Sequence, residues 1–151
     1  MSGHRPHRTP SLLGAAGSFY DHGVIAATTA ATIAAAGFLV IAAFQLLLAL
    51  GAPLGRAAYG GRNAVLSPTL RRTSALAVVI WLLAAVVILG AGSVLAVPLP
   101  DVVLGIGPWV LVVLSTLGAL VNLASSSPWE RFGWAPFSAA LAVLSFIVAT
   151  S

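Results

Sequence analysis

Four long apolar blocks are the feature of this sequence that most constrains its fold; they cover residues 24–50, 74–97, 102–124 and 128–150. The first three contain no charged residue, and the fourth carries charges only near its start. Because a helix rises about 1.5 Å per residue, each block can cross a hydrocarbon core of about 30 Å. We therefore predict an all-α fold, a four-transmembrane-helix up-down bundle over residues 24–151, after a polar N-terminal tail over residues 1–23.

The charge content supports a bilayer as the surrounding solvent. Only 7% of the residues are charged, whereas a soluble domain carries about 25%. The net charge of +4 comes from arginines that sit in short segments beside the apolar blocks, which favours lipid headgroups over nucleic acid as the partner. We therefore predict a multi-pass protein of the cell membrane that contacts the bilayer, with anionic lipids as candidate partners.

Capping and helix-breaking residues mark the ends of the second and third spans. Ser67 and Pro68 predict a helix start upstream of the second block, because serine caps helices and proline suits the first turn. Pro98 ends that block, because proline cannot donate a helical hydrogen bond. The third helix is predicted to start either at Asp101, as a cap, or near Pro108, after a glycine-rich stretch.

The fourth span has the least regular start. Ser127 and Glu130, with Pro128 between them, have the spacing of a capping box with proline at the first helical position. Pro136 then falls inside the helix, where it leaves the Phe132 carbonyl without its partner and predicts a kink. We prefer this longer, kinked helix to one that starts at Pro136, which would be too short to cross comfortably.

The first span is predicted to stay in the mature protein, because its apolar block is far longer than that of a cleaved signal peptide. Residues 11–20 are mildly apolar, and we expect them to lie on the membrane surface. Small residues in the first half of the span predict close contact with other helices; they are Ala26, Thr28, Thr29, Ala30, Thr32 and Ala34.

The distribution of arginines predicts the orientation. With four spans, the first and third loops share one side, which holds Arg56, Arg62, Arg71, Arg72 and Arg131. The other side holds Arg5 and Arg8. The positive-inside rule therefore predicts cytoplasmic first and third loops and extracytoplasmic termini.

The alternation of the four spans between the two sides of the membrane also predicts a candidate binding site. Gln45 and Asn122 lie near the ends of spans one and three, at similar depth and beside the arginine-rich loops. One interpretation is that these amides form interhelical hydrogen bonds, worth about 0.6 kcal/mol each. The other interpretation is that they contact a ligand. Arg56, Arg62, Arg71, Arg72 and Arg131 are interpreted as topology signals and interfacial anchors, or as a grip for a phosphate or carboxylate headgroup.

Glu130 is the single glutamate, and two roles are open to it. The capping-box spacing favours a carboxylate that satisfies helix N-terminal donors. The alternative is a general acid or base, which makes Glu130 the one weak catalytic candidate. In the first loop, Gly60 and Gly61 predict a tight fold of the loop against the membrane.

The sequence predicts neither a metal site nor a cofactor. His4, His7, His22 and Asp21 are the remaining candidate ligands, and they lack metal-binding spacing on a helix. The chain has no cysteine, so thiolate sites and disulfides are excluded.

Several motifs resemble those of a group of small actinobacterial integral membrane proteins whose activity is uncharacterised. The shared pattern is Gln45 followed by Gly51, Pro53 and Gly55; Gly60-Gly61; Leu70-Arg71; Ser74; Asn122 and Ser125; and Glu130-Arg131 with Trp134 and Pro136. The resemblance covers most of the chain after the tail. It implies four spans and supplies no mechanism.

The leading functional hypothesis is a non-enzymatic membrane protein that binds or passes a small ligand or lipid, or supports a membrane partner. The alternative is an intramembrane enzyme acting on a lipid or isoprenoid, with Glu130 as acid or base. Passage of a solute as a channel or transporter would require a homo-oligomer, because four spans are few for a monomeric pore.

Overall fold

The computed structural model describes residues 12–151, with side chains described from residue 23 onward. Four long helices make up most of the described residues: α1 (Leu12–Leu50), α2 (Pro68–Ala91), α3 (Asp101–Leu123) and α4 (Ala135–Ala149). Two short 3₁₀ turns lie between α1 and α2, η1 (Gly55–Ala57) and η2 (Tyr59–Gly61), and a π-helical turn, η3 (Glu130–Trp134), leads into α4. This confirms the predicted all-α four-helix bundle.

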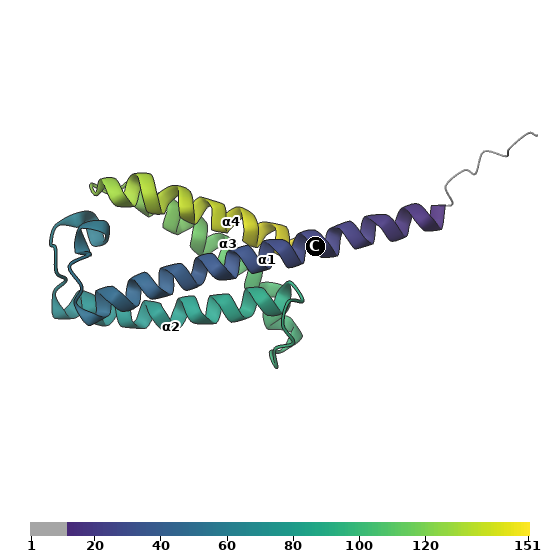
Figure 1. The fold of residues 1–151 in the computed structure, drawn as a ribbon, viewed down its shortest axis with the longest axis horizontal. Coiled ribbons are helices and arrows are strands. Elements are labelled where there is room, and N and C mark those ends of the chain that lie inside the picture. Colours follow the sequence, from purple (N-terminus) through teal and green to yellow (C-terminus); the bar gives the residue numbers. More distant parts are fainter. Residues whose placement is uncertain (1–11) are drawn as a thin grey trace, which may run out of the picture.

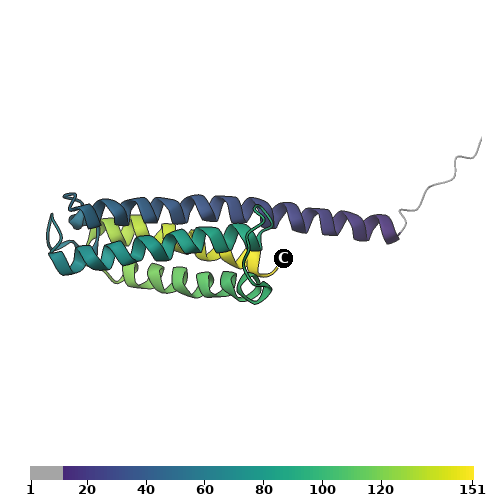
Figure 2. The ribbon, with the colours of Figure 1, turned by 90° about the horizontal axis from the view of Figure 1, so that it is seen from below.

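The helices run antiparallel in an up-down order (Figures 1 and 2). Helix α1 packs along α2, α3 packs along α4, and α4 also contacts α1. Helices α1 and α3 are therefore diagonal to each other. The first loop and the start of the fourth span meet at one end of the bundle, at the left of Figure 1.

Helix α1 starts earlier than the boundary predicted at residue 24. It begins at Leu12 and runs unbroken to Leu50, so its N-terminal part projects beyond the bundle (Figure 1). A helix already nucleated in the span extends at little cost where no proline interrupts it. Residues 12–20 continue α1 and do not form a separate surface helix, while residues 1–11 lie outside the described part.

The end of α2 and the start of α3 differ from the predictions made for them. Ser67 caps α2 as predicted, because its hydroxyl accepts a hydrogen bond from the Leu70 N–H at 3.4 Å. However, α2 ends at Ala91 and not at residue 97, because Ser93 adopts a positive φ of 55° that turns the chain out of the helix. Helix α3 starts at Asp101 without a side-chain cap and passes through Pro108.

The start of the fourth span corrects the capping-box prediction. The helical segment begins near residue 128, as predicted, but Ser127 and Glu130 do not cap it. Instead, both side chains bond to the first loop. The irregularity predicted at Pro136 takes the form of the π-helical turn just before it, where the Ala135 N–H bonds to the Glu130 carbonyl.

Small residues bring α1 and α2 together. Ala31 and Ala34 are fully buried, the Thr28 hydroxyl donates to the Gly92 carbonyl at 3.1 Å, and a methyl group on Gly92 would lie 2.3 Å from the Ala31 Cβ. Only one stripe of a helix can face its neighbours. The small-residue prediction is therefore right for Thr28, Ala30 and Ala34, and wrong for the exposed Ala26, Thr29 and Thr32.

The outside of the bundle is apolar. Large side chains such as Val121 and Phe132 are 70% and 76% exposed, whereas soluble monomers rarely expose large contiguous apolar patches. All four helical segments, Gly23–Leu50, Pro68–Ala91, Asp101–Leu123 and Glu130–Ala149, are long and apolar enough to cross a membrane.

Candidate functional site

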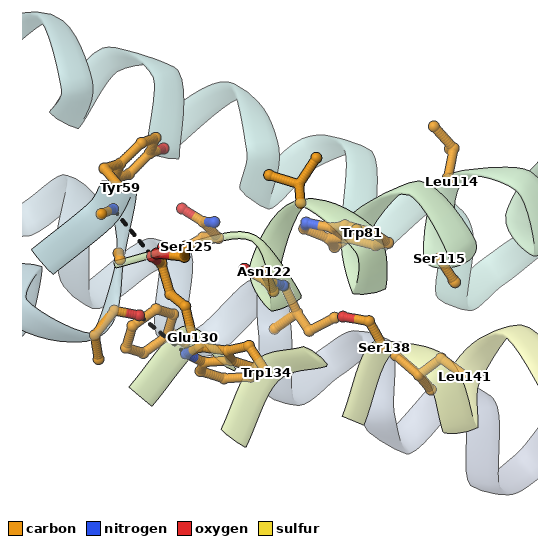
Figure 3. Close-up of a pocket in the computed structure, with 18 residues that line it drawn as sticks. Tyr59, Trp81, Leu114, Ser115, Asn122, Ser125, Glu130, Trp134, Ser138 and Leu141 are labelled. Carbon is orange, nitrogen blue, oxygen red and sulfur yellow. Dashed lines mark hydrogen bonds between the residues drawn. The ribbon is translucent and has the colours of Figure 1, made fainter. Parts of the chain in front are cut away.

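A partly open cavity of about 450 Å³ lies inside the loop end of the bundle (Figure 3). Its walls come from all four helical segments and from the first loop, and it occupies the space between the diagonal helices α1 and α3. Gln45, Asn122 and Glu130 all line it. The parity of the spans therefore placed these three residues correctly at one end, and the fold brings them into one cavity.

Among the residues with described side chains, Glu130 is the only charged one in the lining of this cavity. Its side chain is buried, at 7% exposed. Its Oε2 atom accepts a hydrogen bond from the Gly60 N–H at 3.0 Å and another from the Ser125 hydroxyl, toward which the side chain extends in Figure 3. Both bonds end on the same oxygen, so Oε1 accepts none from the described residues.

The first loop adopts an unusual turn that presents the Gly60 N–H to this carboxylate. Tyr59, Gly60 and Gly61 have successive φ values of 50°, 80° and 71°. Glycine adopts this left-handed region without steric cost, whereas a side chain disfavours it. A Cβ on Gly61 would also lie 2.9 Å from the Arg56 carbonyl oxygen. The predicted tight fold of the Gly60-Gly61 loop is therefore present, and its role is to build one wall of the cavity.

Three further hydrogen bonds hold the loop against the start of the fourth span. The Ser126 hydroxyl donates to the Gly60 carbonyl at 3.2 Å, and the Ser127 hydroxyl donates to the Arg56 carbonyl at 2.8 Å. The Trp134 indole N–H donates to the Ala57 carbonyl at 3.1 Å. The loop is thus fixed over this end of the bundle by segments about 70 residues away in sequence.

Aromatic rings make up much of the wall around Glu130. Phe44 and Trp134 contact each other, with ring centroids 4.7 Å apart. The Tyr59 hydroxyl shares a hydrogen bond of 3.0 Å with Ser74 on α2, and Trp81 lines the deeper part of the cavity while stacking on Phe38.

The two predicted amides occupy facing helices. Gln45 lies on α1 and Asn122 on α3, and both line the cavity. The Gln45 Oε1 atom is buried and has no hydrogen-bond partner, and the same holds for the Ser115 hydroxyl deeper in the wall. A buried polar atom without a partner costs about 1–3 kcal/mol. Both atoms are enclosed by protein atoms, and the predicted interhelical bond of Gln45 Oε1 is not formed.

The five arginines of the first and third loops and their flanks lie at this end of the bundle but outside the cavity lining; they are Arg56, Arg62, Arg71, Arg72 and Arg131. The Arg71 Nε–H donates to the Ala49 carbonyl at 2.9 Å, and Arg71 and Arg72 border a separate small hollow. Arg131 turns back on α3 and donates to the Leu123 and Ser125 carbonyls. Arg56 and Arg62 are exposed.

Sequence reasoning missed the neutral side chains of the site. Phe44, Tyr59, Trp81, Ser115 and Ser138 line the cavity, yet none belongs to a recognisable motif. Ser115 and Ser138 could have been noticed as lone hydroxyls within apolar runs. Among residues with described side chains, no cluster of three or more metal-ligating groups exists; His4, His7, Asp21 and His22 fall outside that part.

No protein-family model matches the chain, and neither a curated protein nor a solved structure matches it. The chemistry of the cavity therefore carries the functional argument alone.

Proposed function

We propose that this protein is a multi-pass membrane protein that binds a small amphiphilic ligand, without transforming it, in the cavity between α1 and α3. One observation carries this proposal: a cavity with mostly apolar walls is lined by the buried Glu130, whose Oε1 atom accepts no hydrogen bond from the described residues. Buried polar groups are normally satisfied, so their presence in a hollow favours a partner that enters it.

The shape of the cavity supports an amphiphile. Glu130, Gln45 and Asn122 gather near the loop end, whereas Ile41, Leu114 and Leu141 line the part nearer the middle of the bundle. A volume of about 450 Å³ is typical of small-molecule sites, which combine mostly apolar walls with few polar groups. The head of a ligand would then lie beneath the first loop and its apolar body between the helices.

In the membrane, we place the loop end on the cytoplasmic side and both termini on the extracytoplasmic side, because five of the seven arginines flank the loop end. Arg71 and Arg72 border their hollow at the start of α2, where guanidinium groups favour anionic lipid headgroups by about 1 kcal/mol each.

An intramembrane enzyme with Glu130 as acid or base is the second candidate, because Glu130 does line the cavity. Acid–base catalysis usually needs a second group that exchanges protons with the substrate. Besides serine hydroxyls and amides, the described lining offers the Tyr59 hydroxyl for this role, and that hydroxyl is bonded to Ser74. Binding without chemistry is therefore the better-supported function.

The test compares two glycine substitutions on α3. Gly118 lines the cavity, and a Cβ there would lie 3.7 Å from the Ser138 hydroxyl, so Gly118→Leu fills the hollow without a backbone clash. Gly105 has open space around it, so Gly105→Leu is the matched control. Each protein is purified from native membranes in mild detergent, and retained small molecules are measured by mass spectrometry.

We expect wild type and Gly105→Leu to retain the same compound and Gly118→Leu to lose it. Equal retention by all three proteins, or retention by none, would contradict the proposal.

A further inference from the structure

We propose that the ligand is a lipophilic organic cation, an ammonium or similar positively charged nitrogen group on an apolar body. This inference rests on the proposed function and specifies its ligand. It follows from the charge, the free acceptors and the aromatic walls of the cavity.

The first argument is charge. Glu130 is the only charged residue of the described chain that lines the cavity, and it is more than nine-tenths buried. The nearest arginine in sequence, Arg131, donates instead to the carbonyls of Leu123 and Ser125. A buried carboxylate without a cationic partner is costly in free energy. A cationic ligand would supply the missing partner.

The second argument concerns the hydrogen-bonding atoms that remain available. Glu130 Oε1 accepts no hydrogen bond from the described residues, and Gln45 Oε1 is buried without a partner. By contrast, two N–H donors of the wall are already used: the Gly60 N–H by Glu130 and the Trp134 indole N–H by the Ala57 carbonyl. Glu130 Oε1 thus remains as a charged acceptor at the polar end, beside the neutral amides of Gln45 and Asn122, and an anionic ligand would find no cationic donor there.

The third argument is the aromatic content around the carboxylate. Phe44, Tyr59 and Trp134 line the cavity together with Glu130, and Phe44 contacts Trp134. The faces of aromatic rings attract cations, most strongly where water is excluded. A carboxylate surrounded by such rings binds a cation whose charge is partly covered by apolar groups better than it binds a hydrated metal ion.

The fourth argument is the length of the apolar part. From Glu130 to Leu141 the fourth span rises by about 16 Å at about 1.5 Å per residue. Over this distance the lining changes to Ile41, Trp81, Leu114 and Leu141, apart from the hydroxyls of Ser115 and Ser138. The cavity therefore accommodates an alkyl or aryl body that extends from the charged head toward the middle of the bundle.

The test uses three probes of the same shape and different charge. They are benzyltrimethylammonium as the cation, neopentylbenzene as its neutral carbon analogue, and phenylmethanesulfonate as the anion. Each is titrated calorimetrically into the full-length protein in a nonionic detergent, with empty micelles as blank. The variants are Glu130→Gln, Phe44→Leu, Gly118→Leu and the control Gly105→Leu.

We expect wild type and Gly105→Leu to bind the cation at least about tenfold more tightly than either other probe. Glu130→Gln should weaken cation binding by about tenfold or more, because it removes the charge and keeps an oxygen acceptor. Phe44→Leu should weaken cation binding by about threefold and leave the neutral probe unaffected. Gly118→Leu should bind none of the probes. Phe44→Leu keeps the test decisive should Glu130→Gln fail to fold.

The outcomes separate the two proposals. Binding of the neutral probe or the sulfonate as tightly as the cation would overturn the cation inference while the cavity keeps its role as a ligand site. The same holds for cation binding that is unchanged in both Glu130→Gln and Phe44→Leu. Absence of binding of every probe to wild type, or equal binding to Gly118→Leu, would count against the cavity itself.

Discussion

At the scale of single residues, Glu130 links the loop to the helices and presents charge to the cavity. Its Oε2 atom accepts hydrogen bonds from the Gly60 N–H and the Ser125 hydroxyl, and its Oε1 atom remains free to bind a ligand in the cavity. Structural and functional roles are therefore divided between two atoms of one side chain. This division means that substitutions at Glu130 can separate the two roles.

Replacing Glu130 by alanine should lower the free energy of unfolding by about 1–3 kcal/mol, because the Gly60 N–H loses its acceptor. Glu130→Gln keeps an oxygen at this position and should lose less than half as much. Reversible unfolding in mixed detergent micelles measures both values. Equal losses in the two variants would mean that Oε2 is not the structural acceptor.

Replacing Gly60 by alanine should destabilise the protein by about 1–2 kcal/mol, because its φ of 80° is unfavourable for a residue with a Cβ. Gly105→Ala is the matched control in the interior of α3, where nothing lies within 4 Å of the new methyl group. That change should be neutral or stabilise by up to about 1 kcal/mol. Thermal denaturation should therefore occur at a lower temperature in Gly60→Ala and at an unchanged or higher temperature in Gly105→Ala. A Gly60→Ala protein as stable as wild type would refute the role of the turn.

At the scale of residues, the sequence predicts which side chains lie at the same end of the bundle but not which atoms they form hydrogen bonds with. Span parity places Gln45, Asn122 and Glu130 at one end. The capping-box spacing suggested a local partner for Glu130, but a more distant donor, the Gly60 N–H, competes successfully for the carboxylate. Such long-range contacts depend on the conformation of the first loop, which local spacing does not encode.

At the scale of elements, the first loop and the start of the fourth span act as one unit. Ser127 is buried and donates to the Arg56 carbonyl, whereas the exposed Ser126 donates to the Gly60 carbonyl. A buried hydrogen bond is more costly to lose than an exposed one, because water does not replace the missing partner.

Ser127→Ala should therefore increase amide hydrogen exchange in residues 55–61 by about fivefold, which corresponds to about 1 kcal/mol. Ser126→Ala should change it by less than twofold. Exchange measured by mass spectrometry on protein in nanodiscs gives both values, with α2 as the internal reference. A larger effect of Ser126→Ala would contradict our inference that the Ser127 hydrogen bond stabilises the loop more than the Ser126 hydrogen bond does.

The elements also show where boundary prediction works. Ser67 and Pro68 predict the start of α2 because capping is a local property. The end of α2 was placed too late, at residue 97, because the turn at Ser93 carries no proline signal. The early start of α1 at Leu12 went unpredicted because Asp21, His22 and Gly23 make the chain polar before residue 24, and polar residues end an apolar span without ending its helix.

At the scale of the whole molecule, the arrangement of the arginines predicts an orientation. A reporter enzyme that is active only outside the cytoplasm should be active when fused after Ser151, and a reporter that fluoresces only in the cytoplasm should be dark there. Neutralising the exposed Arg62 and Arg72 with glutamine reduces the bias from five against two to three against two. That variant should show mixed orientation. A cytoplasmic C-terminus in the wild type would reverse the proposed placement of the cavity.

The bundle itself follows from the length and polarity of four segments, so the sequence predicts it. The sequence does not predict the cavity, because its shape depends on how the side chains of four helices pack between α1 and α3. Gly118 and Ser138 illustrate this, because two small residues on neighbouring helices leave a hollow that larger residues would fill.

Accessibility of that hollow is the central claim, and cysteine labelling tests it most directly, because the chain has no native cysteine. Ser138 lines the cavity, whereas Ser145, two turns further along α4, is fully buried and does not. In nanodiscs, Ser138→Cys should react with a water-soluble methanethiosulfonate at least about tenfold faster than Ser145→Cys, because the reactive thiolate forms only near water. Adding Gly118→Leu should remove the difference. Equal rates at the two positions would contradict the account.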